Sequence, residues 1–167
     1  MQGLPCLLAN RVGTPYGRKV CTPLKIAMTA WERDFITNHR VARLATVNTS
    51  GQPSVVPIVY AFDGERLYTP LDAKPKRVDP RQLQRVRNIQ ANPQVAVIID
   101  DYDEDWRQLA WVQVRGLAQI VEIGPDHAIA VEYLHYKYPQ YALMPLDNRP
   151  IIVITPSRVI SWRATGE

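Results

Sequence analysis

Residues 41–62 read VARLATVNTSGQPSVVPIVYAF, and this stretch decides the fold class. Two apolar runs flank turn-forming residues at 48–52, a pattern typical of a β-hairpin. The second run, 54–62, is apolar on both faces, so we expect the interior of a barrel to cover one side and a partner or a cofactor to cover the other. Pro57 lies inside this run and cannot donate a ladder hydrogen bond, which predicts a bulge or a locally unpaired edge open to binding.

Further short strands and helices follow along the 167-residue chain, which is long enough for one compact domain. Strands are predicted over 66–70 and 94–100, over 109–123 as one strand or two with a bulge or corner at Gly116, and over 151–155 and 158–162 as a final pair. Helices are predicted over 29–39, 80–91 and about 124–138. The first begins with the sequence motif of a capping box. Six or seven strands with three helices indicate a small antiparallel barrel with helices at its rim.

The charge of the chain is concentrated in its first 27 residues. The formal net charge is +4, and residues 1–27 carry four basic groups and no acid, so the remainder is neutral. Both cysteines, Cys6 and Cys21, also lie in this segment. We expect 1–27 to be a weakly ordered extension, either natural or the product of a misassigned start, and 28–167 to form the domain. A neutral, cysteine-free body excludes a disulfide framework, a zinc ribbon and a cysteine nucleophile within it, and disfavours nucleic-acid binding.

The sequence shows no pattern of an export signal or a membrane-spanning segment, so we expect a cytoplasmic protein.

A basic stretch lies between positions 74 and 87, with a single acid, Asp79, among its cations. The predicted helix from Pro80 adds its N-terminal dipole to the same neighbourhood. Two interpretations stay open here: an anion site for one or two phosphates, or a solvated basic face. The six cations are Lys74, Lys76, Arg77, Arg81, Arg85 and Arg87.

An acidic stretch over 100–105 is followed by two tryptophans, Trp106 and Trp111. It lacks the glycine and the distant glutamate of a calcium loop, which favours a solvated loop over a cation site. The tryptophans could stack on an aromatic cofactor or simply cap the barrel. The three histidines are not spaced like the ligands of a metal site. The sequence also contains no motif of the hydrolase, Rossmann or P-loop type. This profile fits a binding module, or an enzyme whose bound cofactor supplies the reactivity.

Several short motifs between Arg43 and Gly116 together resemble one known family. They are RLAT at 43–46, GQP at 51–53, VP at 56–57, DAKPK at 72–76, NI at 88–89, NP at 92–93, YDEDW at 102–106, WV at 111–112 and RG at 115–116. The sequence resembles the pyridoxamine 5′-phosphate oxidase-like split β-barrel proteins, and within them the coenzyme F420-dependent branch. With KYPQY at 137–141 and the strand ending in Trp162, the resemblance covers nearly all of 28–167.

The resemblance implies a mainly β (α+β) fold, an antiparallel split β-barrel of the FMN-binding type. It implies a homodimer with two cofactors at the interface, the ring lying along 55–59 and the phosphate held by basic residues after the third strand. It further implies an oxidoreductase that uses coenzyme F420, or alternatively FMN, to transfer hydride to or from a small unsaturated substrate. The cofactor-binding residues would be Thr46, Val56, Pro57, Ile58, Lys74, Lys76, Arg85, Trp106 and Trp111.

A non-catalytic flavin or haem carrier on the same barrel is the alternative. No catalytic residue and no metal ligand is assigned. Pyridoxamine phosphate is not expected as the substrate, because the chain is shorter than that oxidase and lacks its C-terminal Arg-x-His signature.

Overall fold

The computed structural model describes residues 26–71 and 79–164. Seven strands and three α-helices form there, which confirms the mainly β fold class. The helices are α1 (Ala30–Asn38), α2 (Gln84–Ala91) and α3 (Pro125–Lys137), with short 3-10 turns η1 (Pro80–Gln82), η2 (Trp106–Gln108) and η3 (Pro139–Ala142). The strands are β1 (Val41–Val47), β2 (Pro53–Val59), β3 (Ala61–Phe62), β4 (Leu67–Pro70), β5 (Gln94–Asp101), β6 (Ala110–Val121) and β7 (Ile151–Arg163).

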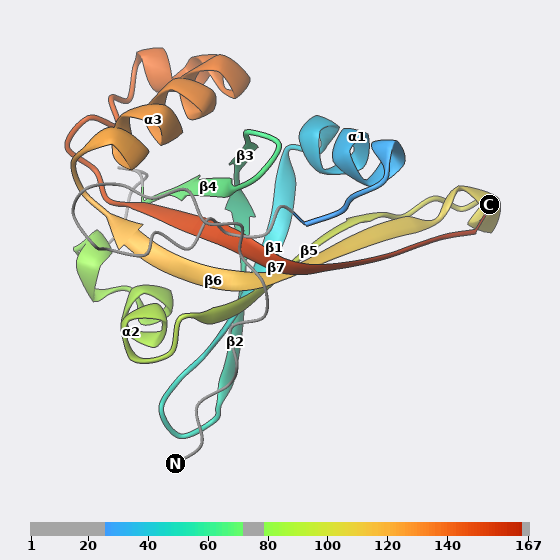
Figure 1. Cartoon of the computed structure of the whole chain (residues 1–167), viewed down its shortest axis with the longest axis horizontal. Coiled ribbons are helices and arrows are strands. Elements are labelled where there is room, and N and C mark those ends of the chain that lie inside the picture. The colour runs from blue at the N-terminus through green and yellow to red at the C-terminus, as the bar shows by residue number, and fades with distance from the viewer. Residues whose placement is uncertain (1–25, 72–78, 165–167) are drawn as a thin grey trace, which may run out of the picture.

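The strands form one antiparallel sheet in the order β2-β1-β5-β6-β7-β4-β3. Its two edge strands, β2 and β3, follow each other in the chain and are separated only by Tyr60. The sheet must therefore curl until its edges approach, which gives the split barrel of Figure 1. The prediction of one strand over 54–62 was wrong in this respect, because the chain passes from one edge of the sheet to the other at Tyr60.

The first helix begins as its sequence predicts. The Thr29 hydroxyl oxygen accepts a hydrogen bond from the Glu32 N–H at 3.2 Å, and the Glu32 carboxylate accepts one from the Thr29 N–H at 2.7 Å. This capping box fixes the start of α1, so that Phe35 and Ile36 are buried against the barrel interior.

Two further predicted elements differ from the structure. The helix expected over 80–91 is broken at Leu83, whose extended backbone separates η1 from α2. The pair of strands expected after residue 150 is one strand, β7, which runs through Pro156 and Ser157. It stays continuous because β7 bulges at Ser157, opposite the step from Arg115 to Gly116 in β6, and this irregularity accommodates the missing N–H of Pro156. The bulge itself confirms the prediction made for Gly116.

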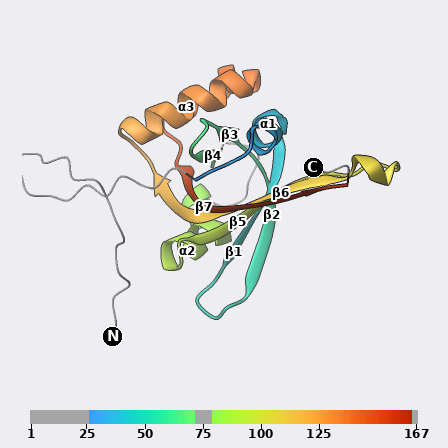
Figure 2. The ribbon, with the colours of Figure 1, turned by 45° about the vertical axis from the view of Figure 1, so that its right-hand side comes forward.

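Helix α3 covers only half of the outer face of the sheet. It packs on β3, β4 and β7 through a second apolar cluster that includes Tyr68, Leu134, Tyr138 and Val153. Beyond the barrel, β5, β6 and the end of β7 continue as a long arm with η2 at its tip, and α3 lies away from it in both views (Figures 1 and 2). Among residues 26–71 and 79–164, no helix covers the outer face of β2, β1, β5 and β6. Within the described ranges, no helix is long and apolar enough to cross a membrane.

Candidate functional site

A shallow groove of about 480 Å³ lies on this uncovered outer face. It is within the size range of small-molecule sites. Its walls come from four adjacent strands, so the curvature of the sheet, and not a loop, gives the groove its shape. The side chains that line it are Arg43, Val55, Ile98, Asp100, Trp111 and Gln113.

Strand alternation explains why these side chains meet. Arg43 of β1 stands opposite Pro57 of β2 and Ile98 of β5, and Ile98 stands opposite Gln113 of β6. Trp111 lies two residues before Gln113 and therefore on the same face. The residues between them turn inward, as the burial pattern along β6 shows. The groove is a consequence of register, which the tertiary structure sets.

The groove has an apolar wall and a polar end. Val55, Ile98 and Trp111 supply the apolar surface, on which a flat ring can lie. The guanidinium of Arg43 forms an ion pair with the Asp100 carboxylate. The Gln113 side-chain oxygen accepts a hydrogen bond from Arg115 Nε at 2.9 Å. Both Arg43 and Asp100 remain partly exposed, so the pair can also bond a ligand in the groove.

Of the predicted cofactor-binding residues, Trp111 lines the groove and Pro57 lies beside it on an edge strand. Because β2 is an edge strand, it agrees with the expectation that the strand is locally unpaired at Pro57. Val56 and Ile58 occupy the intervening positions and pack into the core, so only their backbone can reach a ligand outside. Val55 belongs to the range 55–59 along which the resemblance places the ring, although it was not among the predicted cofactor-binding residues. The groove residues that the sequence did not indicate are Arg43, Ile98, Asp100 and Gln113.

The predicted residue Thr46 is buried in the barrel. Its hydroxyl oxygen accepts a hydrogen bond from Asn88 Nδ2 of α2 at 2.9 Å, and Asn88 Oδ1 accepts one from Gln84 Nε2 at 2.7 Å. The polar side chain of Asn88 is thereby satisfied at 1% exposure. Thr46 therefore positions α2 against β1, and it can influence a ligand only through these elements.

The basic stretch is only partly available for an anion. Lys74 and Lys76 lie outside the described residues, and Arg85 is half-buried on α2. Arg81 is bound by Glu122 through two hydrogen bonds of 2.9 and 3.0 Å. This bidentate contact raises the pKa of Arg81 and lowers that of Glu122. Arg81 therefore belongs to a surface ion pair, and the anion interpretation rests on the other cations.

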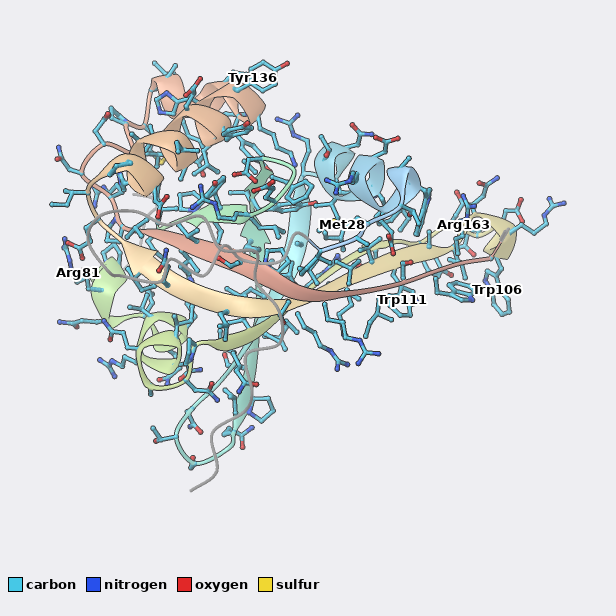
Figure 3. All side chains as sticks on the ribbon, in the orientation of Figure 1. Met28, Arg81, Trp106, Trp111, Tyr136 and Arg163 are labelled. Atoms are coloured by element: carbon cyan, nitrogen blue, oxygen red, sulfur yellow. The ribbon has the colours of Figure 1, made fainter. Side chains whose placement is uncertain are left out.

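Trp106 does not reach the groove of its own chain. It lies in η2 at the tip of the arm and is 71% exposed. Figure 3 shows Trp106 at one end of the molecule, Trp111 farther back along the arm, and Arg81 at the opposite end. Within one chain, Trp106 therefore lies far from Arg81 of the basic stretch.

The acidic stretch is largely occupied by ion pairs and hydrogen bonds. Asp100 pairs with Arg43, Asp101 accepts from His39 Nε2 at 2.8 Å, and Asp105 pairs with Arg107. The hydrogen bonds from Arg107 lower the pKa of Asp105. Across 26–71 and 79–164, no group of three or more His, Cys, Asp or Glu residues is arranged to hold a metal ion.

Comparison with known proteins identifies relatives of the whole domain. Residues 28–163 match the pyridoxamine 5′-phosphate oxidase family. The chain is 26% identical over 140 residues to a 5a,11a-dehydrotetracycline/5a,11a-dehydrooxytetracycline reductase of Streptomyces rimosus, covering 83% of this chain and 85% of the reductase.

Two solved structures share the fold. One, named an F420 reductase, superposes with a TM-score of 0.54 and 29% identity over 76% of this chain and 94% of that chain. The other, the haem storage protein HutZ of Vibrio cholerae, superposes with a TM-score of 0.60 over 78% of this chain and 89% of its own. At 16% identity, the second likeness concerns the fold alone.

Proposed function

The chain belongs to the pyridoxamine 5′-phosphate oxidase family, and we propose that it is an oxidoreductase that binds coenzyme F420 in the groove on the outer face of its sheet. FMN is the alternative cofactor. The reaction is hydride transfer to or from a small unsaturated substrate. A homodimer completes the site, because the groove is open to solvent on the side away from the sheet.

The observation that carries this proposal is the composition of the groove. A flat ring needs an apolar surface on one face and hydrogen-bond partners at its edge. Trp111, Ile98 and Val55 offer the apolar surface, while Arg43, Asp100 and Gln113 offer donors and acceptors at one end. The groove residues therefore fit a deazaflavin or flavin ring.

The protein contributes binding, orientation and exclusion of water. A reduced deazaflavin or flavin supplies a hydride when bound. Arg43 can donate a hydrogen bond to a carbonyl oxygen at the polar end of the groove, which holds a bound molecule in one orientation. The Asp100 carboxylate keeps that guanidinium in place. The proton that accompanies hydride addition to a carbon–carbon double bond comes from solvent in this proposal.

We assign the phosphate of the cofactor to Lys74, Lys76 and Arg85 because the family resemblance implies basic residues there. The names of the relatives support the reaction class, since one is a reductase of dehydrotetracyclines and another an F420 reductase. A conjugated acceptor, with its double bond next to a carbonyl group, is the substrate class that we propose.

The experiment is a titration of the purified protein with coenzyme F420, FMN and haem, followed by absorbance and fluorescence. We expect micromolar or tighter binding of one of the first two. Trp111→Ala should weaken that binding about tenfold, because it removes the largest apolar contact. The control is Tyr136→Ala, since Tyr136 projects from α3 at 91% exposure and is far from the groove (Figure 3). Failure of both F420 and FMN to bind would overturn the proposal.

A non-catalytic carrier is the second candidate, and the shared fold of a haem storage protein favours testing it. The two candidates differ in turnover. An oxidoreductase consumes reduced cofactor when a conjugated acceptor is added, whereas a carrier binds its ligand without consuming it. Tight haem binding without F420 or FMN binding would establish the carrier.

A further inference from the structure

Lys137, the residue that ends α3, has a side chain in an unusual environment for a lysine. It is the single lysine of residues 79–164, and residues 26–71 contain none. The side chain is half-buried, its Nζ donates to the His39 carbonyl oxygen at 2.6 Å, and this nitrogen lies 4.3 Å from the centre of the Tyr60 ring. An ammonium ion at this place exchanges much of its hydration for one carbonyl group and the face of a ring.

No acidic side chain is paired with Lys137 or with Arg40 within residues 26–71 and 79–164. The carboxylate of Asp101 accepts instead from His39 Nε2, at 2.8 Å. Arg40 is a second cation beside Lys137, because its Nη2 donates to the Lys137 carbonyl oxygen at 2.8 Å. Arg40 Cζ lies 5.0 Å and Lys137 Nζ 6.0 Å from the centre of the Tyr138 ring. Two like charges therefore share one aromatic ring.

Desolvation and a neighbouring cation are the two conditions that keep a lysine amine neutral and nucleophilic. Burial, and secondarily the charge of Arg40, lowers the pKa of Lys137 to about 8. At about pH 7.5 the neutral amine is then on the order of 100-fold more abundant than in a lysine of ordinary pKa. Lys137 does not line the groove, so the proposed oxidoreductase reaction leaves this nucleophile unused.

We propose that Lys137 is a site of reversible carbamate formation with carbon dioxide. The neutral amine attacks the carbon atom of carbon dioxide, so that a C–N bond forms, one C=O π bond becomes a carboxylate, and one proton leaves the nitrogen for solvent. No oxidant or reductant takes part. The product keeps one N–H on the nitrogen, which can still donate to the His39 carbonyl oxygen. Carbon dioxide is small, so it needs no large pocket to reach a half-buried amine.

The charges around the amine favour the carbamate. The modification turns a positive group into a negative one while Arg40 stays cationic, so a repulsive pair becomes an attractive pair. Partial burial makes that attraction less screened than on an open surface. The dipole of α3 opposes an anion near its C-terminus, but Arg40 already binds the Lys137 carbonyl oxygen there and offsets it. The Arg40 guanidinium is therefore the counter-ion of the carbamate.

The modification acts where the barrel closes. Lys137 immediately precedes Tyr138, whose hydroxyl oxygen accepts from the N–H of Tyr60 between the two edge strands. Arg40 immediately precedes β1, so an ion pair between it and the carbamate ties the end of α3 to the first strand. Because carbon dioxide then binds the folded chain in preference to the unfolded one, it stabilises the fold by mass action.

The test traps the adduct on the purified, cofactor-free protein. The protein is equilibrated with isotope-labelled bicarbonate and carbon dioxide near neutral pH, treated with triethyloxonium to fix carbamates as ethyl esters, and digested for mass spectrometry. We expect label on Lys137 on the order of 100-fold above that in the same protein unfolded in urea, where its amine is an ordinary one. Lys137→Arg should remove this label.

Arg40→Gln tests the counter-ion. It should lower the label on Lys137 several-fold, because the carbamate loses its partner and the amine loses the cation that keeps it neutral. Arg87→Gln is the matched control, since Arg87 is an exposed arginine of α2, and it should leave the label unchanged. Circular dichroism verifies that each variant is folded.

Thermal unfolding in bicarbonate, compared with chloride of equal ionic strength, gives a second measurement. The midpoint of the wild type should rise in bicarbonate, and that of Lys137→Arg should not. Absence of label on Lys137, equal label in the folded and unfolded protein, or unchanged label in Arg40→Gln would each overturn the inference.

Discussion

The hydroxyl oxygen of Tyr138 accepts a hydrogen bond from the backbone N–H of Tyr60 at 3.2 Å, and the same oxygen lies 2.9 Å from the Tyr60 carbonyl oxygen. Tyr60 is the single residue between the two edge strands of the sheet, so Tyr138, directly after α3, fastens the barrel at the point where its edges meet. The Tyr138 hydroxyl also lies 2.6 Å from the carbonyl oxygen of Arg40, at the start of β1.

Tyr138→Phe should therefore destabilise the fold. Removing the hydroxyl leaves the buried N–H of Tyr60 without its acceptor, which costs about 1–3 kcal/mol. Urea unfolding followed by fluorescence measures the loss. Tyr136→Phe, in the last turn of α3 just before Tyr138, is the matched control, because the Tyr136 side chain is 91% exposed. Equal stability of the two variants would contradict the role assigned to Tyr138.

Lys137 should make stability depend on pH between about 8 and 10. Its ammonium nitrogen Nζ lies 2.6 Å from the His39 carbonyl oxygen and 4.3 Å from the centre of the Tyr60 ring. Burial, and secondarily the charge of Arg40, lowers the pKa of Lys137 to about 8 from its ordinary value of 10.5. The other ionisable group close to this nitrogen is Tyr138.

Between these two pKa values the unfolded chain binds the proton and the folded chain does not, so the free energy of unfolding rises with pH. The gain is about 1–2 kcal/mol once solvent screening of a half-buried group is considered. Thermal unfolding from pH 7 to 9.5 tests this, with Lys137→Met expected to lose the rise. Measurements stay below pH 10 because burial raises the folded-state pKa of Tyr60, so that ionisation of the unfolded tyrosine lowers stability at higher pH.

Thr46→Val should lower stability more than cofactor affinity. The substitution keeps the shape of the side chain but removes the oxygen to which Asn88 Nδ2 donates at 2.9 Å. A buried amide left without that acceptor costs about 1–3 kcal/mol. Chemical denaturation and a cofactor titration of the same preparation separate the two effects. Intact stability with lost binding would instead place Thr46 in direct contact with the cofactor.

Gly116→Ala should disrupt the pairing of β6 with β7 at the bulge. A Cβ atom at this position would lie 3.0 Å from the Thr155 carbonyl carbon and 3.1 Å from Pro156 Cα, and closer still to the Thr155 carbonyl oxygen. Because these neighbours are backbone atoms of the paired strand, β7 must move, at a cost of about 1–3 kcal/mol. The thermal midpoint reports the loss. Gln119→Ala, an exposed substitution on the same strand, should leave it nearly unchanged.

Most elements of this fold could be predicted from local patterns. The capping box at Thr29, the hairpin around residues 48–52 and the bulge at Gly116 each follow from residues close together in the chain. Within the sheet, two predictions that were wrong concern continuity: the break of the strand at Tyr60, and the unbroken course of β7 through Pro156. Both depend on what lies across the sheet, which local sequence does not encode.

The sequence by itself determined the alternation that sends Trp111 and Gln113 to one face of their strand, because side-chain direction in a strand has a period of two residues. It also determined a family resemblance that the match over 28–163 confirms. Only the tertiary structure decided that Val55, Ile98 and Trp111 share one groove while Trp106 lies beyond it. Strand order and register set those distances, and they arise from packing between segments far apart in the chain.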